Sequence, residues 1–174
     1  AIEMGVLKNR WLIRALETIE MHLYRHAVLI VPVAESTREY LLNKGIPSEK
    51  IKIITNGIDA NYLASSSVAP EEVRQQLGLA DKFVVSYIGT HGMAQRLDTL
   101  LDAAVLLQDD PEIHVLLVGE GAERERLVAR VRAQGLGNVT MLGQQPREAI
   151  PGLVAAADLV AVILRRAELF QKVI

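Results

Sequence analysis

The stretch VVSYIGTHGMAQRLDTLL, residues 84–101, decides the fold. Its first five residues mostly favour a β-strand, Gly89 and Gly92 form a corner, and leucines at three- and four-residue steps follow. A strand, a glycine corner and an amphipathic helix in this order predict a βα unit. The corner is either an anion-binding site, because glycine lets backbone N–H groups approach an oxygen, or only a tight turn between strand and helix.

The same order of elements recurs to the end of the chain. The predicted strands are 83–88, 114–118, 139–142 and 159–164. The predicted helices are 71–77, 97–107, 122–134 and 147–156. Strands that alternate with helices of this length predict an α/β fold with a parallel, doubly wound sheet. Ligands bind beyond the carboxyl ends of the strands in such sheets, so Gly89, Gly119 and Gly143 are expected to meet at one cleft.

The residues before the serine-rich stretch 64–67 predict a separate, smaller part. An amphipathic helix is expected within residues 1–26, because apolar side chains recur there at helical spacing. These side chains are Leu12, Leu16, Ile19 and Leu23. A membrane-surface helix is the alternative, but Glu17 and Glu20 interrupt the basic face that anionic lipid would favour.

Two short strands and a second helix are predicted next in this part. Residues 28–31 have the pattern of a strand buried on both faces, and residues 51–54 that of the next strand. Ser36 and Glu39 have the capping-box spacing, which predicts a helix start. The Asn-Gly pair at 56–57 favours a turn with positive φ.

The composition limits the function. The 174 residues carry a formal charge of -2, so the chain has no general attraction for nucleic acid, and none is predicted as a partner. No cysteine is present, which excludes disulfides and thiolate metal sites. No metal site is predicted either, because His22, His26 and His114 lack a carboxylate cluster at ligand spacing. Both ends lack turn or cap residues, as in a piece of a longer protein.

Two common nucleotide-binding motifs are absent from the glycine corners. The segment Gly119-Glu-Gly121 lacks the third glycine of the dinucleotide fingerprint, because Arg124 stands in its place. No glycine is followed by Lys and then Ser or Thr, so there is no Walker loop. The charged run at 123–126 is predicted to be a solvated helix face.

Six pieces of the chain, taken in order, resemble one family. They are KIITNGID (52–59), VSYIG (85–89), HVLLVGEG (114–121), NVTMLG (138–143), PRE (146–148) and AAADL (155–159). Their order and spacing are similar to those of the retaining, nucleotide-sugar-dependent glycosyltransferases with the GT-B fold, carbohydrate-active-enzyme family four (group 1). The variant GTHGMA at 89–94, with LRRAELF at 164–170, looks like the branch that adds amino- or deoxy-sugars during surface-polysaccharide assembly.

The resemblance implies two Rossmann-like domains that face each other across a cleft. Residues 1–62 would be the C-terminal part of the acceptor-side domain, and residues 63–174 a truncated donor-nucleotide-binding domain. The chain would then be a fragment that lacks the start of the N-terminal domain and the end of the C-terminal domain. Glu168 is the candidate for the first of two family glutamates, and the second would fall beyond residue 174. This polypeptide alone is therefore expected to be inactive.

The resemblance also implies a donor-binding site at the carboxyl edge of the sheet, although no catalytic residue is predicted. The predicted donor-binding residues are Gly89, Thr90, His91, Gly92, Arg96, Gly119, Glu120, Gly121, Leu142, Gly143, Gln144 and Arg165. Family members usually place an arginine after the first glycine corner and a lysine a few residues on. Thr90 follows Gly89 here, and Arg96 stands in the region of the lysine.

Each polar residue of this set has a second interpretation. Arg96 and Arg165 are expected to contact phosphate, or to be solvated surface arginines. His91 either hydrogen-bonds the donor or packs in the turn. Glu120 either meets a sugar or ribose hydroxyl or is a helix-start charge favoured by the dipole. The segment Gly143-Gln144-Gln145 is expected to lie beside the base, where its main-chain groups can contact the edge of uracil.

The expected function is transfer of a sugar from a nucleoside diphosphate sugar, here a UDP-sugar, to an acceptor, with retention at the anomeric carbon. No cofactor is expected, because the nucleotide sugar is itself a substrate. A lipid-linked saccharide is the expected acceptor, which implies a cytoplasmic enzyme with peripheral association at the inner face of the membrane. The alternatives are a UDP-sugar epimerase on the same fold and a non-catalytic nucleotide-binding module.

Overall fold

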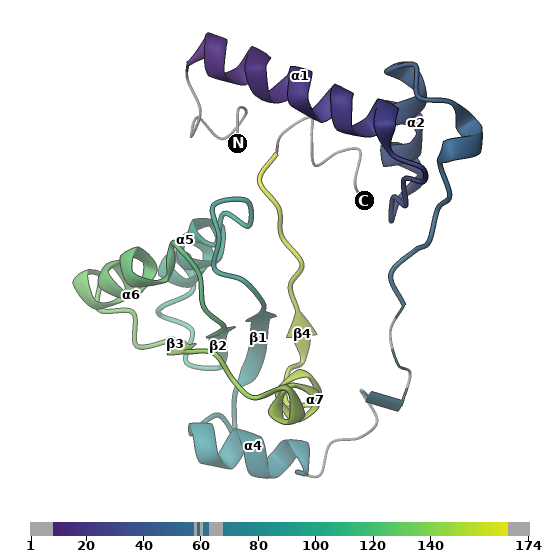
Figure 1. Ribbon diagram of the computed structural model, residues 1–174. Coiled ribbons are helices and arrows are strands. Elements are labelled where there is room, and N and C mark those ends of the chain that lie inside the picture. Colours follow the sequence, from purple (N-terminus) through teal and green to yellow (C-terminus); the bar gives the residue numbers. More distant parts are fainter. Residues whose placement is uncertain (1–8, 58, 60, 63–67, 167–174) are drawn as a thin grey trace. The chain divides into compact units, whose positions relative to one another are not determined.

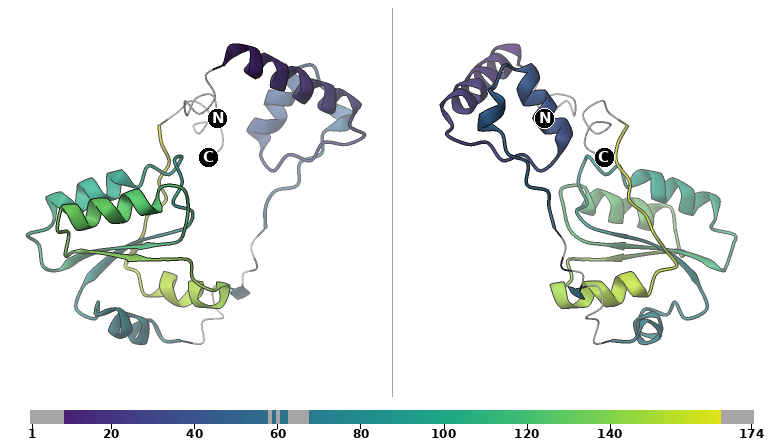
Figure 2. Two further views of the ribbon diagram at one scale, coloured as in Figure 1. Left: turned by 60° about the vertical axis from the view of Figure 1, so that its left-hand side comes forward. Right: turned by 90° about the vertical axis from the view of Figure 1, so that its right-hand side faces the viewer.

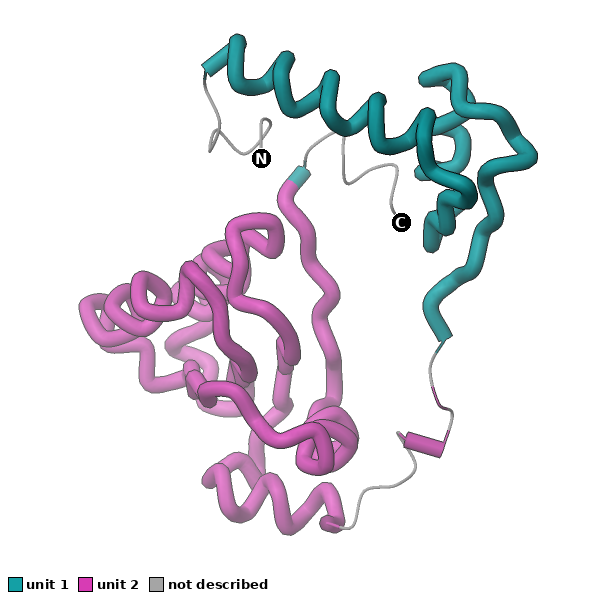
Figure 3. Tube along the Cα trace, viewed as in Figure 1, with its two compact units in different colours: residues 1–58, 166–174 teal, residues 59–165 magenta. Residues whose placement is uncertain are grey.

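The computed structural model describes residues 9–57, 59, 61–62 and 68–166. The chain divides into two compact units, residues 1–58 with 166–174 and residues 59–165 (Figure 3). Glu168 and the serines at 65–67 lie outside the described residues. We describe the two units separately.

The second unit is built on a four-stranded parallel sheet (Figure 1). Its strands are β1 (Phe83–Ile88), β2 (Ile113–Val118), β3 (Val139–Leu142) and β4 (Leu159–Val160), in the order β3-β2-β1-β4. All three pairings are parallel, so the predicted parallel α/β sheet is confirmed. The last strand is shorter than the predicted 159–164, because only Leu159 and Val160 pair with β1. A further backbone bond, Ala161 N–H to Ser86 O at 2.7 Å, continues this contact by one residue.

Helices cover both faces of this sheet (Figures 1 and 2). They are α4 (Pro70–Leu77), α5 (Asp98–Leu106), α6 (Arg124–Ala133) and α7 (Ile150–Ala155). Pro70 is the first residue of α4, as expected for a side chain that fixes φ and needs no N–H donor there. The predicted helix 147–156 is divided, because Arg147–Ala149 form the 3-10 helix η2 and the α-helix begins only at Ile150.

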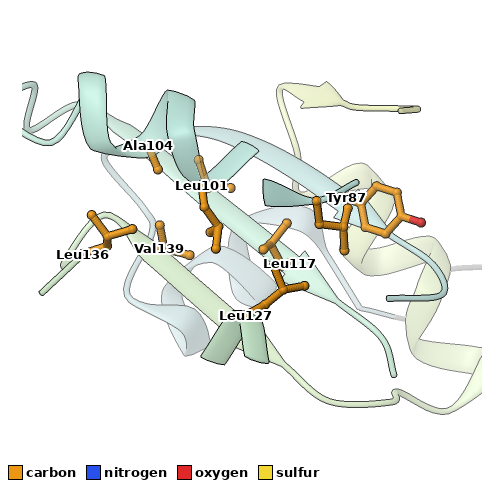
Figure 4. Close-up of a cluster of buried hydrophobic side chains, with 9 residues drawn as sticks. Tyr87, Leu101, Ala104, Leu117, Leu127, Leu136 and Val139 are labelled. Carbon is orange, nitrogen blue, oxygen red and sulfur yellow. The ribbon is translucent and has the colours of Figure 1, made fainter. Parts of the chain in front are cut away.

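Two apolar clusters hold these layers together. Leu101 from α5 and Leu127 from α6 are fully buried against Leu117 of β2 on one face (Figure 4). Val84, Leu116 and Leu153 form the cluster on the other face, beside α4 and α7. Each fully buried leucine contributes about 1.5–3 kcal/mol, so these layers fix the sheet edge at which the loops lie.

Asp158 and Arg74 tie α4 to the sheet across 84 positions of sequence. The Asp158 Oδ2 atom accepts a hydrogen bond of 2.7 Å from the Val84 N–H and another of 2.7 Å from Arg74 Nη2. Arg74 also donates through Nε to the Ala156 carbonyl at 2.8 Å. The main-chain bond to Val84, and next Arg74, lower the pKa of Asp158, although burial opposes them. These hydrogen bonds give Asp158, the aspartate of the AAADL segment, a structural role that requires no ligand.

The first unit contains α1 (Arg10–His26), α2 (Glu35–Asn43) and the 3-10 helix η1 (Ser48–Lys50). The amphipathic helix predicted within residues 1–26 is confirmed, and Asn9 caps it by accepting the Trp11 N–H at 3.0 Å. Met21 and Tyr24 of α1 pack on a small core of Leu41, Ile46 and Ile51. The stripe Leu12, Leu16, Ile19 and Leu23 faces away from this core and stays 46–63% exposed.

Three local predictions for this unit are wrong. The segments 28–31 and 51–54 form only one parallel bridge, between Ile30 and Ile51, rather than buried strands. Val28 is 92% exposed, because no described neighbouring strand continues the ladder or covers its faces. Ser36 lies inside the first turn of α2, so it cannot act as the predicted cap. The Asn-Gly pair at 56–57 does not have positive φ.

No helix in the part of the chain that the structure describes combines the length and the apolar character that crossing a bilayer requires.

Candidate functional site

Main-chain hydrogen bonds join the loop after β1 to the loop after β2. Gly89 N–H donates to the Val118 carbonyl at 2.9 Å, and His91 N–H donates to the Glu120 carbonyl at 2.8 Å. The His91 carbonyl in turn accepts the Glu123 N–H at 2.9 Å. These bonds run between two neighbouring strand ends and satisfy polar groups that a loop would otherwise leave to water. The carboxyl edge of the sheet therefore carries one joined pair of loops.

Gly119 and Gly121 permit this close approach. Their φ values are +138° and +155°, a region that side-chain-bearing residues rarely adopt. A Cβ atom on Gly119 would overlap the Gly89 carbonyl oxygen, and one on Gly121 would overlap the His91 carbonyl oxygen. Both glycines of the Gly-Glu-Gly segment thus serve backbone packing between the loops, whatever ligand the edge holds.

One hollow, of about 400 Å³, opens beside Gly89. Its lining residues are Ile88, Gly89, Thr90, Val118, Gly119, Glu120, Gln144, Gln145 and Ile150. We call it the glycine hollow. It brings five of the predicted donor-binding residues together, namely Gly89, Thr90, Gly119, Glu120 and Gln144. Its lining contains amide and hydroxyl groups and one carboxylate but no cation, which suits a neutral, hydrogen-bonding ligand group better than a phosphate.

Glu120 places its carboxylate between the loops after β2 and β3. Its Oε1 atom is 3.2 Å from Arg124 Nε, an ion pair whose angle does not make it a hydrogen bond. The same oxygen lies 3.0 Å from the point where a Cβ on Gly143 would stand. Gly143 therefore leaves room for this carboxylate, although Gly143 itself lines neither of the two hollows described here.

A second hollow, of about 310 Å³, opens on the other side of His91. Its lining residues are Gly92, Met93, Arg96, Leu97, Asp98, Glu123, Arg126 and Arg165. We call it the arginine hollow. It contains three of the predicted donor-binding residues, Gly92, Arg96 and Arg165. Of the three strand-end glycines predicted to share one cleft, Gly89 and Gly119 line the glycine hollow together, and Gly143 lines neither hollow.

The three arginines of this hollow differ in their partners. Arg126 donates to both carboxylate oxygens of Asp98, at 2.9 and 2.5 Å, and also pairs with Glu123 at 2.7 Å. Arg130 donates to Asp98 as well. Within the run 123–126, which was predicted to be a solvated helix face, Arg126 is half-exposed and also pairs with Asp98 of α5. The guanidinium groups of Arg96 and Arg165 have no hydrogen-bond or ion-pair partner among the described residues.

Arg96 has an unusual backbone conformation. Its φ is +45°, the only positive value at a non-glycine residue in the described part of the chain. A side chain in this left-handed region costs about 1–2 kcal/mol, and residues held there against this cost cluster at functional sites. Arg96 lines the arginine hollow and stands immediately before Leu97 and α5.

His91 lines neither hollow, although its neighbour Thr90 lines the glycine hollow and Gly92 lines the arginine hollow. Its side chain is fully buried, at 0% exposure, and neither ring nitrogen has a hydrogen-bond partner of good geometry among the described residues. Burial lowers the pKa of His91, and the nearby Arg124 charge lowers it further, against opposing effects of Glu120 and the Val118 carbonyl. The imidazole is therefore neutral at pH 7. Of the two interpretations given above, packing in the turn describes the position of this side chain.

Two more predicted residues lie away from both hollows. Gly121 packs against His91, and Leu142 packs with the apolar cluster beside α7, where it lines a smaller groove with Val73 and Leu153. Conversely, the sequence did not single out Ile150 of the glycine hollow, or Asp98 and Arg126 of the arginine hollow, as site residues. Asp98 and Arg126 could have been suspected only from opposite charges on consecutive predicted helices.

Residues 9–57, 59, 61–62 and 68–166 contain no group of three or more His, Asp or Glu side chains that could hold a metal ion.

Solved structures with this arrangement define the class of the fold. A complex of Anabaena Alr3699/HepE with UDP and glucose aligns with a TM-score of 0.69 and 28% identity, over 84% of this chain and 41% of that one. Sucrose-phosphate synthase from Thermosynechococcus elongatus aligns with a TM-score of 0.66 and 26% identity, over 86% and 38%. The fold is that of GT-B glycosyltransferases, as the resemblance implied.

Family models and relatives give the family. A model described as "Glycosyl transferases group 1" matches residues 70–170, and one described as "Glycosyltransferase Family 4" matches residues 5–62. The chain belongs to the glycosyl transferases group 1 family. WcaI of Escherichia coli (strain K12), named for glycosyl transfer in colanic acid biosynthesis, is 28% identical over 136 residues, 77% of this chain. The alpha-D-kanosaminyltransferase of Streptomyces kanamyceticus is 25% identical over 154 residues, 86% of this chain. The chain spans 33% and 40% of the lengths of these two relatives.

Proposed function

We propose that this chain contributes the nucleotide-sugar site of a retaining glycosyltransferase that moves a sugar from a UDP-sugar to a saccharide acceptor. Family membership supports the reaction class. The UDP and glucose bound to the Anabaena relative support the donor. The name of WcaI, with colanic acid biosynthesis in it, supports an acceptor in surface-polysaccharide assembly. The lipid-linked acceptor and work at the inner face of the membrane remain predictions from the resemblance.

One observation carries the proposal, namely that a hollow lined by amide and hydroxyl groups without any cation and a second hollow lined by three arginines both open at the carboxyl edge of a parallel sheet. Ligands of open α/β sheets bind at this edge. A nucleoside diphosphate has a neutral, hydrogen-bonding half and an anionic half, and the two hollows match these halves. No residue of the chain is assigned as the catalytic group.

The chemistry that this site can supply is electrostatic. When the bond from the anomeric carbon to the donor phosphate breaks, negative charge accumulates on the departing diphosphate. Arginines held in place beside the diphosphate stabilise this charge without having to reorganise during the reaction. Glu120 and the amides of Gln144 and Gln145 can meanwhile hydrogen-bond the nucleoside.

Calorimetric titration with UDP, UDP-glucose, GDP and NAD tests the donor class. We expect the nucleoside diphosphates and the nucleotide sugar to bind and NAD to bind much more weakly. Binding of NAD without UDP or UDP-glucose would end the proposal.

Product analysis of a protein that completes both domains, with this chain as its donor-binding part, then separates the three functions considered. Sugar transfer requires an acceptor, an epimerase releases an altered sugar without one, and a nucleotide-binding module binds UDP-glucose without turnover. An epimerised sugar formed in the absence of acceptor would replace the transferase proposal.

A further inference from the structure

We propose that Tyr62 positions the nucleoside part of the donor by holding the segment between β3 and α7 in place. The nucleoside as ligand rests on the proposed function, whereas the contact between Tyr62 and this segment is seen directly in the structure. Neither Tyr62 nor Arg147, the residue that it contacts, lines the glycine hollow or the arginine hollow. Tyr62 is therefore a positioning residue, which acts through the residues that do line the glycine hollow.

The segment between β3 and α7 forms part of the wall of the glycine hollow. Gln144 and Gln145 line the hollow just before the 3-10 helix η2, and Ile150 lines it just after. The three residues of η2, Arg147–Ala149, therefore separate two parts of one wall. A shift of η2 would displace the lining residues on both of its sides.

Tyr62 contacts η2 in two ways, from 85 positions earlier in the chain. Its hydroxyl donates a hydrogen bond of 2.6 Å to the Arg147 carbonyl. The Arg147 guanidinium lies over the Tyr62 ring, 4.9 Å from the ring centroid, which is within the range of a cation–π interaction. The same Arg147 carbonyl accepts the N–H of Ile150, the first residue of α7. One oxygen atom thus joins the Tyr62 hydroxyl to the backbone of a residue that lines the hollow.

Tyr62 is itself fixed by hydrogen bonds at the start of the second unit. We call the residues Asp59, Asn61 and Tyr62 the entry turn, because the chain enters the second unit at Asp59. Asp59 Oδ1 accepts the Asn61 N–H at 2.9 Å, and the Asp59 carbonyl accepts the Tyr62 N–H at 3.0 Å. A site keeps its binding geometry only when the residues behind it are themselves fixed. The entry turn gives this support to the backbone of Tyr62.

The contact of Tyr62 should affect one hollow and not the other. The lining of the arginine hollow contains no residue of the segment 143–150, whereas that of the glycine hollow contains three. Loss of the contact should therefore change the affinity for a nucleoside and leave the affinity for a free diphosphate unchanged. A general loss of structure would change both affinities, so the comparison separates a positioning role from a purely structural one.

The test compares Tyr62→Phe with Tyr40→Phe. Tyr62→Phe removes the hydroxyl that holds the Arg147 carbonyl and keeps the ring beside the guanidinium, so folding should be unchanged. Tyr40 is an exposed tyrosine of α2 that lines neither hollow, and Lys44 Nζ lies 5.4 Å from its ring centroid. Its substitution therefore removes a hydroxyl from similar surroundings. Calorimetric titration measures the binding of UDP, uridine and inorganic pyrophosphate to each variant, and hydrogen exchange measures the opening of the Ile150 amide without ligand.

We expect Tyr62→Phe to weaken UDP and uridine binding by about threefold, the factor that corresponds to one net hydrogen bond, and to leave pyrophosphate binding unchanged. The Ile150 amide should exchange faster in Tyr62→Phe than in the unmodified chain. Tyr40→Phe should change neither binding nor exchange. If Tyr62→Phe weakens uridine no more than Tyr40→Phe does, or weakens pyrophosphate as much as uridine, the positioning role is refuted and the proposed function stands.

Two further outcomes separate the inference from the proposed function. An unmodified chain that binds neither UDP nor uridine would refute the proposed function, and the nucleoside role of Tyr62 with it. Equal exchange of the Ile150 amide in both variants would refute the hold of Tyr62 on η2, whether or not UDP binds.

Discussion

The carbonyl oxygen of Gly89 fills the space in which a side chain on Gly119 would have to lie. We therefore expect Gly119→Ala to lower the free energy of unfolding by at least about 2 kcal/mol, because overlap with backbone cannot be relieved by a rotamer change. Denaturant titration followed by circular dichroism measures this loss. Gly137→Ala is the control, since a Cβ there meets nothing within 4 Å. Equal stability of the two variants would contradict the assigned contact between the loops.

Asp98 should make the stability of the second unit depend on acid. Hydrogen bonds from Arg126, and next Arg130, lower the pKa of Asp98 to about 2 from its ordinary 3.8, against the opposing effect of burial. A carboxyl whose folded pKa is depressed contributes stability above its unfolded pKa and loses it as the pH falls toward the folded pKa. We expect about 1 kcal/mol to be lost between about pH 4 and pH 2, since the pair is partly exposed.

The substitution Asp98→Asn should remove this part of the acid dependence. Unfolding free energies at a series of pH values measure it, with Asp109→Asn as a control that removes a carboxylate without ion-pair partners among the described residues. Asp158, whose pKa is also lowered, should leave a residual slope in the variant. An unchanged pH profile for Asp98→Asn would show that the Asp98 carboxylate does not carry the expected linkage.

His91 should make the free energy of unfolding depend on pH in a less acidic range than Asp98 does. Because burial lowers the pKa of His91 below its ordinary 6.5, the unfolded chain binds more protons than the folded one just below that pH. Stability is therefore complete above about pH 6.5 and decreases as the pH falls further. His91→Leu should reduce this slope without loss of stability at pH 8, since neither ring nitrogen makes a well-formed hydrogen bond to a described residue that the substitution would remove.

A second histidine contributes to the same slope. Burial, and next the Lys82 charge, lower the pKa of His114. The slope should consequently persist in part in His91→Leu and decrease further when His114 is also replaced. A slope that His91→Leu leaves fully intact would show that His91 is not the buried neutral group described above.

Arg96 allows strain and binding to be separated. Arg96→Gly and Arg96→Ala both remove the guanidinium, but only glycine accommodates φ +45° without cost. We expect Arg96→Gly to be more stable than Arg96→Ala by about 1 kcal/mol, as judged by thermal unfolding. Both should bind UDP equally weakly. A glycine variant less stable than the alanine variant would argue against the left-handed backbone.

The sequence predicted the strands and helices of the second unit well. Each of these segments shows a hydrophobic periodicity, and this periodicity depends only on which of its own side chains are buried. Strands 83–88 and 139–142 were placed at their observed bounds. The pattern failed for 28–31 and 51–54, where apolar residues found no described sheet to join. Hydrophobic periodicity indicates that a segment tends to be buried, but it does not show which neighbouring element covers that segment.

The candidate site was predictable only in part, for a related reason. Glycines at strand ends mark the ligand edge, but their spacing could not show that Gly119 packs directly on the Gly89 carbonyl. Ion pairs such as Asp98 with Arg126 join residues 28 positions apart, and local charge patterns do not reveal them. Arg165 was suspected from its place after the last strand, whereas the Ala94 carbonyl that fastens it emerges only from the folded loops.

The backbone N–H and C=O of His91 join the walls of both hollows. Its N–H holds Glu120, on the wall of one hollow, and its C=O holds Glu123, on the wall of the other. One peptide unit on each side of the His91 α-carbon thus anchors the main chain of both glutamates. A change of backbone conformation at residue 91 would therefore disturb the walls of both hollows at once.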